Sequence, residues 1–128
     1  MLIIPQPRLD EMLAHVSSDR MQEMCGLMAG DGNRVTRVLP VPNSLRSPWA
    51  YRMDGPEFID AMKACEFEPL TIFHSHLSGP PTPSLTDVAQ ALYPDSFYVI
   101  VSFHVEPPSV RAFRIAGGRV DEVEIRVE

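Results

Sequence analysis

The sequence predicts one α+β domain, in which about three helices flank a mixed, largely antiparallel sheet. Three observations support this fold class. Apolar strand-like segments are interleaved with segments of helical periodicity, the 13 prolines fall mostly between them, and an Ala-Gly-Gly turn joins the last two strands. The 128 residues, 45% of them hydrophobic, can form one proper core but not two. We therefore treat residues 1–128 as a single domain.

The composition excludes several classes of partner. A net charge of −6 and a pI near 5.1 argue against nucleic acid, because phosphate binding requires a basic face. No apolar run approaches the thickness of a bilayer, and the N-terminus lacks the features of a signal peptide. We therefore expect a cytoplasmic protein without a membrane partner. Cys25 and Cys65 need no disulfide in that compartment, and a homodimer is compatible with the sequence.

The first part of the chain predicts a helix and then a hairpin. Residues 8–17 have an apolar stripe at helical spacing, formed by Leu9, Met12, Leu13 and Val16. His15 lies off this stripe, so we expect it to be solvated. Residues 23–30 and 34–41 are apolar segments separated by a Gly-rich turn, which indicates two paired strands. Glu23 opens the first strand, where a solvated charge is commoner than a functional one.

The middle of the chain predicts an extended segment and a second helix. Residues 49–53 read as a short strand with Trp49 and Tyr51 on one face. Two aromatic residues that cover a core edge are the commoner outcome, and an edge strand that pairs with a peptide is the functional alternative. Asp54 is expected to cap a helix that ends near residue 67, shortly before a proline.

The second half predicts a central sheet and a final hairpin. Residues 70–76 form an apolar strand with a polar end, and a helix is expected over 84–93. Residues 97–103 are almost continuously apolar, which is typical of a strand covered on both faces. Residues 109–115 and 119–127 flank the Ala-Gly-Gly turn and predict two hairpin strands.

Three polar residues, two at the end of the 70–76 strand and one after it, form a candidate metal site. Side chains alternate along a strand, so His74 and His76 project from the same face. A loop and a helix start can bring Asp87 back to the same point. Two histidine nitrogens and one carboxylate oxygen make a plausible zinc set that leaves a fourth position for water.

Each part of this pattern also has a structural explanation. Ser84 and Asp87 have the spacing of a helix cap with an acidic first turn, and histidines at a strand end are often hydrogen-bonded surface groups. The joint pattern is more informative. His-x-His, seven residues, Ser, two residues and Asp would arise by chance in a chain of this composition with a frequency of roughly 1 in 2,000.

The sequence resembles the JAMM (MPN-plus) family of zinc metallopeptidases, in particular its short prokaryotic members. Residues 74–87 match every specified position of the downstream family motif, and residues 23–30 resemble its upstream Glu-x-Cys-Gly-Leu-Leu-x-Gly segment. The likeness extends over nearly the whole chain and includes Asn43. Leu77 is a departure, because many members have proline there. The resemblance implies the JAMM/MPN fold, which has a cytidine-deaminase-like arrangement.

The resemblance also implies a role for each motif residue. His74, His76 and Asp87 would hold one Zn²⁺ per chain. Glu23 would act as general base and then as general acid, and Ser84 would stabilise the oxyanion. The implied reaction is hydrolysis after the tail of a ubiquitin-like protein.

The expected partner is a small ubiquitin-like or sulfur-carrier protein with a Gly-Gly C-terminus. A narrow groove that admits backbone and rejects side chains would suit such a tail. Trp49, Tyr51 and Met53 are the candidate substrate-binding residues. A non-catalytic MPN-like scaffold is the alternative, although such members usually lack the zinc ligands. A zinc deaminase would need His-x-Glu with Pro-Cys-x-x-Cys, and this chain has no Cys-x-x-Cys.

Overall fold

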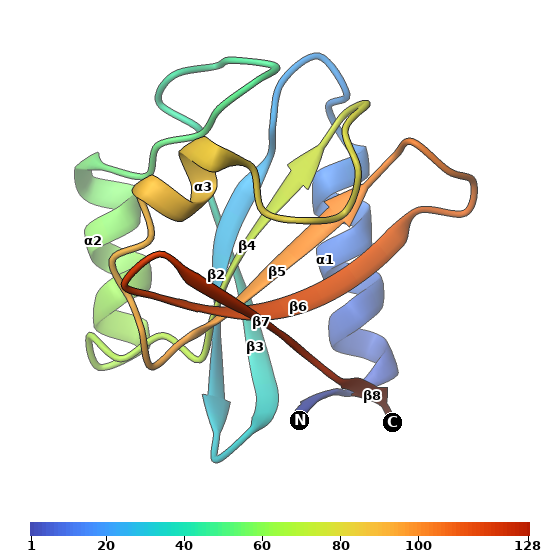
Figure 1. Cartoon of the computed structure of the whole chain (residues 1–128). Helices are drawn as coiled ribbons and strands as arrows, with labels where there is room; N and C mark the ends of the chain where they lie inside the picture. Colours follow the sequence, from blue (N-terminus) through green and yellow to red (C-terminus); the bar gives the residue numbers. More distant parts are fainter.

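A computed structural model describes all 128 residues as an eight-stranded mixed sheet with three helices (Figure 1). The elements in chain order are β1 (Leu2–Ile4), α1 (Gln6–Ser17), β2 (Cys25–Asp31), β3 (Arg34–Val41), α2 (Gly55–Ala64), β4 (Thr71–His76), α3 (Leu85–Ala89), β5 (Phe97–Ser102), β6 (Ser109–Ala116), β7 (Arg119–Val123) and β8 (Ile125–Val127). Four of the seven strand pairings are antiparallel, so the predicted α+β class is confirmed. None of the helices has the length and apolarity that a membrane span requires.

The sheet separates two apolar layers. Its strand order is β7-β6-β5-β4-β2-β3-β1-β8, and the parallel pair β4 and β5 lies inside it. All residues of β4 and β5 are buried, and the nearly continuous apolar pattern of 97–103 predicted this for β5. Met12 and Val16 of α1 pack on one face, while Ala61 and Met62 of α2 pack on the other. Figure 1 shows α3 on the same side as α2.

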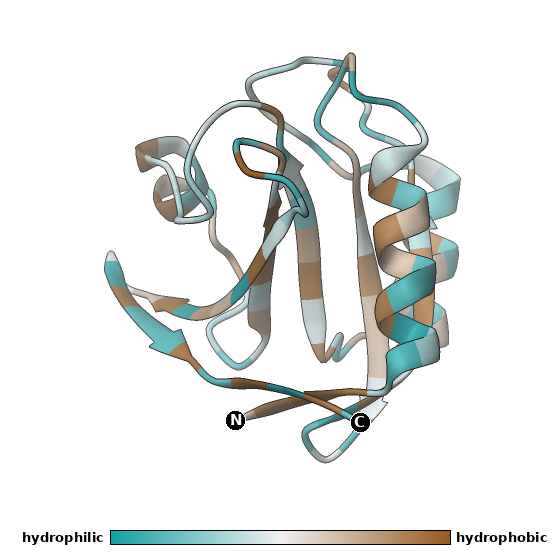
Figure 2. Cartoon of the chain, turned by 90° about the vertical axis from the view of Figure 1, so that its right-hand side faces the viewer, coloured by the Kyte–Doolittle hydropathy of each residue, from teal (hydrophilic) through white to brown (hydrophobic).

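The last two strands lie at opposite edges of the sheet although one residue separates them. β7 ends at Val123 and β8 begins at Ile125, so the chain crosses from one edge to the other at Glu124. β8 then pairs in parallel with β1, and the Leu2 N–H donates to the Glu124 carbonyl at 2.9 Å. The sheet is therefore strongly curled, and the two termini lie close together (Figure 2). Neither β1 nor the break before β8 was predicted from the sequence.

All three helices differ from their predicted bounds. α1 begins at Gln6 rather than at residue 8, and α2 ends at Ala64 rather than near residue 67. α3 ends at Ala89 rather than near residue 93, because the chain turns away and the N–H groups of Leu92 and Tyr93 donate to the Tyr98 hydroxyl. α2 has Asp54 at the N-cap position as predicted, but the Asp54 side chain makes no capping hydrogen bond.

The predicted strand over 49–53 is wrong. No strand forms there, because the backbone of Ala50 and Arg52 is hydrogen-bonded to the Asn43 side chain instead of to a neighbouring strand. The two aromatic residues also do not share an environment. Trp49 is 77% exposed, whereas Tyr51 packs against His74.

Candidate metal centre

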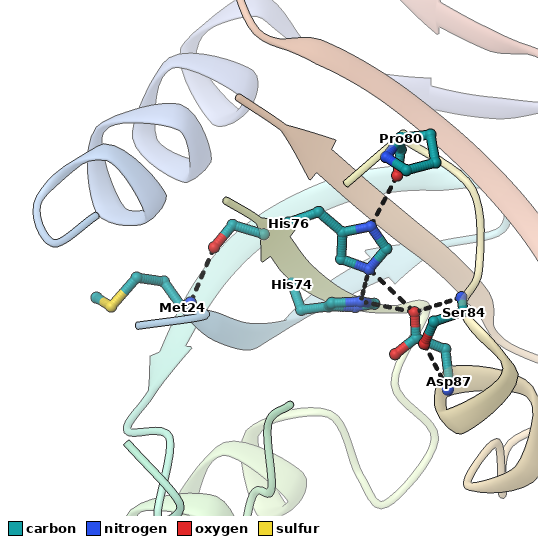
Figure 3. A network of polar contacts seen from close by, with 7 residues as sticks. Met24, His74, His76, Pro80, Ser84 and Asp87 are labelled. Atoms are coloured by element: carbon teal, nitrogen blue, oxygen red, sulfur yellow. Dashed lines mark hydrogen bonds and ion pairs between the residues drawn. The ribbon is translucent and has the colours of Figure 1, made fainter. Parts of the chain in front are cut away.

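The C-terminal end of β4 places two imidazoles side by side. His74 and His76 point to the same side of the strand, and their Nε2 atoms lie 3.0 Å apart (Figure 3). Asp87 from α3 points its Oδ2 at both rings, at 3.2 Å from His74 Nε2 and 3.0 Å from His76 Nε2. The three predicted donor atoms therefore form a compact triangle, and all three side chains are almost completely buried.

A capping box at the start of α3 sets the position of the carboxylate. The Ser84 hydroxyl accepts a hydrogen bond from the Asp87 N–H at 3.0 Å, and the Ser84 N–H donates to Asp87 Oδ2 at 2.9 Å. The cap and the donor group thus use the same residues. The local structural explanation and the functional one are both realised, because the box that begins the helix also aims the Asp87 oxygen at the histidines.

The hydrogen-bonding chemistry of the triangle fits a metal ion. His76 Nδ1 lies 2.8 Å from the Pro80 carbonyl, so in a neutral ring this nitrogen donates and Nε2 keeps its lone pair. That lone pair faces His74 Nε2 and a carboxylate oxygen. Tetrahedral bonds of about 2.0–2.1 Å place neighbouring ligand atoms roughly 3.3 Å apart. The observed separations are 3.0–3.2 Å, so His74, His76 and Asp87 could hold a metal ion.

The ionisation states favour the same conclusion. Burial lowers the pKa of His74, which keeps the imidazole in the neutral form that binds metals. For Asp87, burial acts in the opposite direction, but the hydrogen bonds from His74 and His76 outweigh it and hold the pKa well below its usual range. His74 therefore supplies a neutral nitrogen and Asp87 an anionic oxygen.

Glu23 lies two residues before the start of β2 and is 5% exposed. It lines a pocket of about 280 Å³ together with His76, Ser84 and the 77–83 loop. Burial is the main cause that raises the pKa of Glu23 to about 7. The charge of His76 lowers this pKa, and the charge of Asp87 raises it. Its Oε1 atom has no hydrogen-bond partner in the protein. A proton-accepting oxygen is thus available beside the candidate metal ligands.

Ser75, the middle residue of the His-Ser-His motif, has a role that sequence reasoning missed. Its side chain faces away from the two histidines, its Oγ accepts a hydrogen bond from the Met24 N–H, and its own N–H donates to the Met24 carbonyl, both at 2.9 Å. These bonds fasten the segment that carries Glu23 to the strand that carries the histidines. The alternation of side chains along a strand is the signal that separates this position from its neighbours.

The three candidate substrate-binding residues lie beside the donor group, but on different pockets. The Tyr51 ring stacks on His74 with centroids 4.4 Å apart. Tyr51 and Met53 line a mainly apolar pocket of about 450 Å³ that reaches Asp87. Trp49 lines the smaller pocket that contains Glu23. Asp87 lines the first pocket and His76 the second, so the donor group lies between the two.

The remaining cysteine and histidines near the site are not among the candidate ligands. Burial raises the pKa of Cys25 to about 12, and its thiol donates to the Val41 carbonyl at 3.4 Å. His104 lies against Ser102, whose hydroxyl bonds to the carbonyl of the 77–83 loop at Gly79. The prediction that His15 is solvated is wrong, because its Nε2 atom lies 3.0 Å from the Cys25 carbonyl.

The curled α+β fold and the two-histidine, one-carboxylate group beside a buried glutamate define a JAMM-type hydrolase. Residues 5–116 match the family described as prokaryotic homologs of the JAB domain, and the chain belongs to that family. The resemblance predicted from the two sequence motifs is therefore confirmed.

Curated relatives and solved structures agree with this assignment. The chain is 37% identical to the CysO-cysteine peptidase of Mycobacterium tuberculosis, over 98% of this chain and 90% of that protein. It is also 37% identical to the desampylase of Pyrococcus furiosus, over 99% and 91%. A solution structure of a protein from Desulfitobacterium hafniense has a TM-score of 0.87 at 34% identity, covering 100% and 93%. A structure described as a JAMM metalloprotease-like zinc site has a TM-score of 0.65 at 18% identity, covering 100% and 98%, which supports the fold alone.

Proposed function

We propose that this chain is a zinc-dependent peptidase or isopeptidase that cleaves after the Gly-Gly tail of a small ubiquitin-like or sulfur-carrier protein. One observation carries the proposal: the donor triangle of His74, His76 and Asp87 shares its surroundings with a buried glutamate that has a free oxygen. Two relatives that are named a CysO-cysteine peptidase and a desampylase support the reaction class and the kind of substrate.

Zn²⁺ suits the donor group because two imidazole nitrogens and one carboxylate oxygen leave a fourth position open. His74, His76 and Asp87 would be the ligands, and the Pro80 carbonyl would fix the ring orientation of His76. When bound, zinc lowers the pKa of a water molecule toward ~7 and withdraws charge from a carbonyl oxygen.

Glu23 is the proposed proton carrier. Its carboxylate accepts the proton of the attacking water and then delivers it to the leaving amine. In the metal-free chain burial raises the pKa of Glu23 to about 7, and a general base and acid works best when its pKa is close to the operating pH. The free Oε1 atom is the position at which the proton would be taken up.

Ser84 is the proposed oxyanion donor. Its oxygen already accepts the Asp87 N–H, but that bond leaves the hydroxyl hydrogen free. Ser84 lines the pocket that also holds Glu23 and His76, so its hydroxyl could donate to the oxygen that gains charge during attack. Its role in the capping box fixes the position of the hydroxyl oxygen before substrate arrives.

The 50–53 segment is the proposed site at which the substrate tail pairs. Asn43 and Ser44 hold the backbone of Ala50 and Arg52, whereas the N–H and C=O groups of Tyr51 and Met53 bond to nothing in the chain. These free groups recur at every second residue, which is the spacing that an added β-strand requires. A tail that ends in Gly-Gly can lie against them without a side-chain clash.

Cleavage of a carrier fusion tests the proposal. The substrate is a small carrier protein whose Gly-Gly end is joined to a second protein. Zinc-loaded wild type should cleave it, a chelator should stop cleavage, and added zinc should restore it. Glu23→Gln should keep its zinc and lose about 10²- to 10⁴-fold in kcat. If zinc-loaded wild type cleaved no fusion of this kind, the non-catalytic scaffold would become the better assignment.

A further inference from the structure

Asn43 is a buried side chain that joins two separate parts of the proposed site. It is 5% exposed and lies in the loop after β3. Its Nδ2 donates to the Glu23 carbonyl at 2.9 Å and to the Ala50 carbonyl at 3.0 Å. Its Oδ1 accepts from the N–H groups of Leu45 and Arg52, both at 3.1 Å. All four hydrogen-bonding positions of the amide are therefore used.

The two parts that Asn43 joins have no strand pairing to hold them together. Glu23 precedes β2, and its N–H donates to the Ser47 carbonyl at 2.9 Å in the same loop. The 50–53 segment is likewise held by this loop rather than by the sheet. Both main-chain bonds of Glu23 therefore end on the loop that also carries the free groups of Tyr51 and Met53.

We propose that Asn43 is a positioning residue that fixes the general base and the substrate-pairing segment relative to each other. This inference rests on the function proposed above. With its amide in place, the 50 and 52 backbone groups face inward and those of 51 and 53 face the substrate. The same amide holds the Glu23 main chain at a set distance from that segment. The bond to be cleaved is therefore presented to the base in one register.

The proposal separates Asn43 from the metal ligands. His74, His76 and Asp87 lie on β4 and α3, and Asn43 makes no hydrogen bond to any of them. Changing the amide should therefore leave metal binding intact. It should instead affect turnover through Glu23 and substrate affinity through the 50–53 segment, because one side chain supports both.

Asn43→Asp is the sharpest variant because it keeps the shape and both acceptors but removes both donors. The new carboxylate would face the carbonyl oxygens of Glu23 and Ala50, and this repulsion releases both. Asn33→Asp is the matched control, since Asn33 is exposed and uses its amide only to donate to the Met1 carbonyl at 2.9 Å. Both variants are made in the full chain and loaded with zinc.

The variants are compared by zinc content, by kcat and KM on the Gly-Gly fusion, and by amide hydrogen exchange. For Asn43→Asp we expect one zinc per chain, a kcat lower by about 10- to 100-fold and a KM higher by roughly threefold or more. The Glu23 and Arg52 amides should exchange faster together. Asn33→Asp should match the wild type in every measurement.

Two results would overturn the proposal. The first is a folded, zinc-loaded Asn43→Asp protein with kcat and KM within about twofold of wild type. The second is a loss of activity that only follows a loss of zinc. If Asn43→Asp does not fold, amide hydrogen exchange of the wild-type protein tests the proposal instead. Its Glu23 and Arg52 amides must show protection factors within about tenfold of each other, and independent opening would refute the coupling. Wild type without activity would reject the proposed function but leave this exchange test valid.

Discussion

The two halves of the proposed site are built in different ways. The donor half comes from one stretch, residues 74–87, in which a strand end and a helix start face each other. The other half combines Glu23 with the 43–53 loop, and its order depends on main-chain bonds to Asn43, Ser44 and Ser47. Only Ser75 and Met24 tie the two halves together by hydrogen bonds between β4 and the segment before β2.

This difference implies that the two halves have separate functions. The donor half is rigid because buried β-strand residues and a capping box hold each ligand atom. In the loop half Trp49 is exposed, and the backbone N–H and C=O groups of Tyr51 and Met53 have no hydrogen-bond partner in the chain. Changes in the donor half should therefore alter metal content, and changes in the loop half should alter turnover or affinity at constant metal content.

The largest effect is expected in the donor half. His76→Ala removes one of three ligands and the bond to the Pro80 carbonyl. Bound zinc should fall below about one tenth of the wild-type content, and cleavage should be lost with it. Metal analysis after gel filtration measures this. His15→Ala, which changes a part-buried histidine away from the triangle, is the control and should retain zinc. Full zinc in His76→Ala would contradict the ligand assignment.

A smaller effect is expected at Ser84, where the donor half meets the reacting atoms. Ser84→Ala should lose about 3 kcal/mol of transition-state stabilisation, which lowers kcat by a factor of roughly 10². Loss of the cap should cost about 1 kcal/mol of folding stability. Steady-state kinetics measures the loss of kcat, and thermal unfolding measures the loss of folding stability. Both are needed, because the two losses have different origins. A variant that is less stable but equally fast would show that Ser84 is only a cap.

The same division explains what the sequence could predict. The period of two in a strand and the spacing of a capping box are local rules, so His74, His76, Ser84 and Asp87 could be placed together from sequence alone. The predicted strands over 34–41 and 70–76 agree with β3 and β4 because their burial follows from their own composition.

The loop half followed no local rule. The extended pattern of 49–53 predicted a strand, but the single side chain of Asn43 satisfies the backbone that a strand neighbour would have paired. β1 and β8 were missed for a similar reason. Each has only three residues, and they are strands because they pair with each other across the whole length of the chain. Long-range pairing of this kind leaves no periodic signal.

A moderate effect is expected in the loop half. Met53→Pro removes one N–H that is free in the protein and would serve the substrate tail. KM for the Gly-Gly fusion should rise by about 5- to 10-fold, while zinc content and kcat change little. Proline at position 51 is less suitable, because the Tyr51 ring also stacks on His74. Met53→Ala retains the N–H and is the control, and an equal rise of KM in both variants would point to the side chain instead.

The smallest effect concerns the buried carboxyl of Glu23 in zinc-free protein. Its pKa of about 7 lies above the ordinary value of 4.5, so the folded chain binds a proton that the unfolded chain releases. This contribution to stability is complete below about pH 4.5 and is lost as the pH rises through about 7. Glu23→Gln has no carboxyl at this position to titrate. The Tm of the variant relative to that of wild type should therefore rise by roughly 5 °C across this pH interval and stay constant above it. Thermal unfolding of both proteins with chelator between pH 5 and 8 measures the difference. A difference that does not change with pH would show that water already solvates Glu23, and that burial does not tune it for proton transfer.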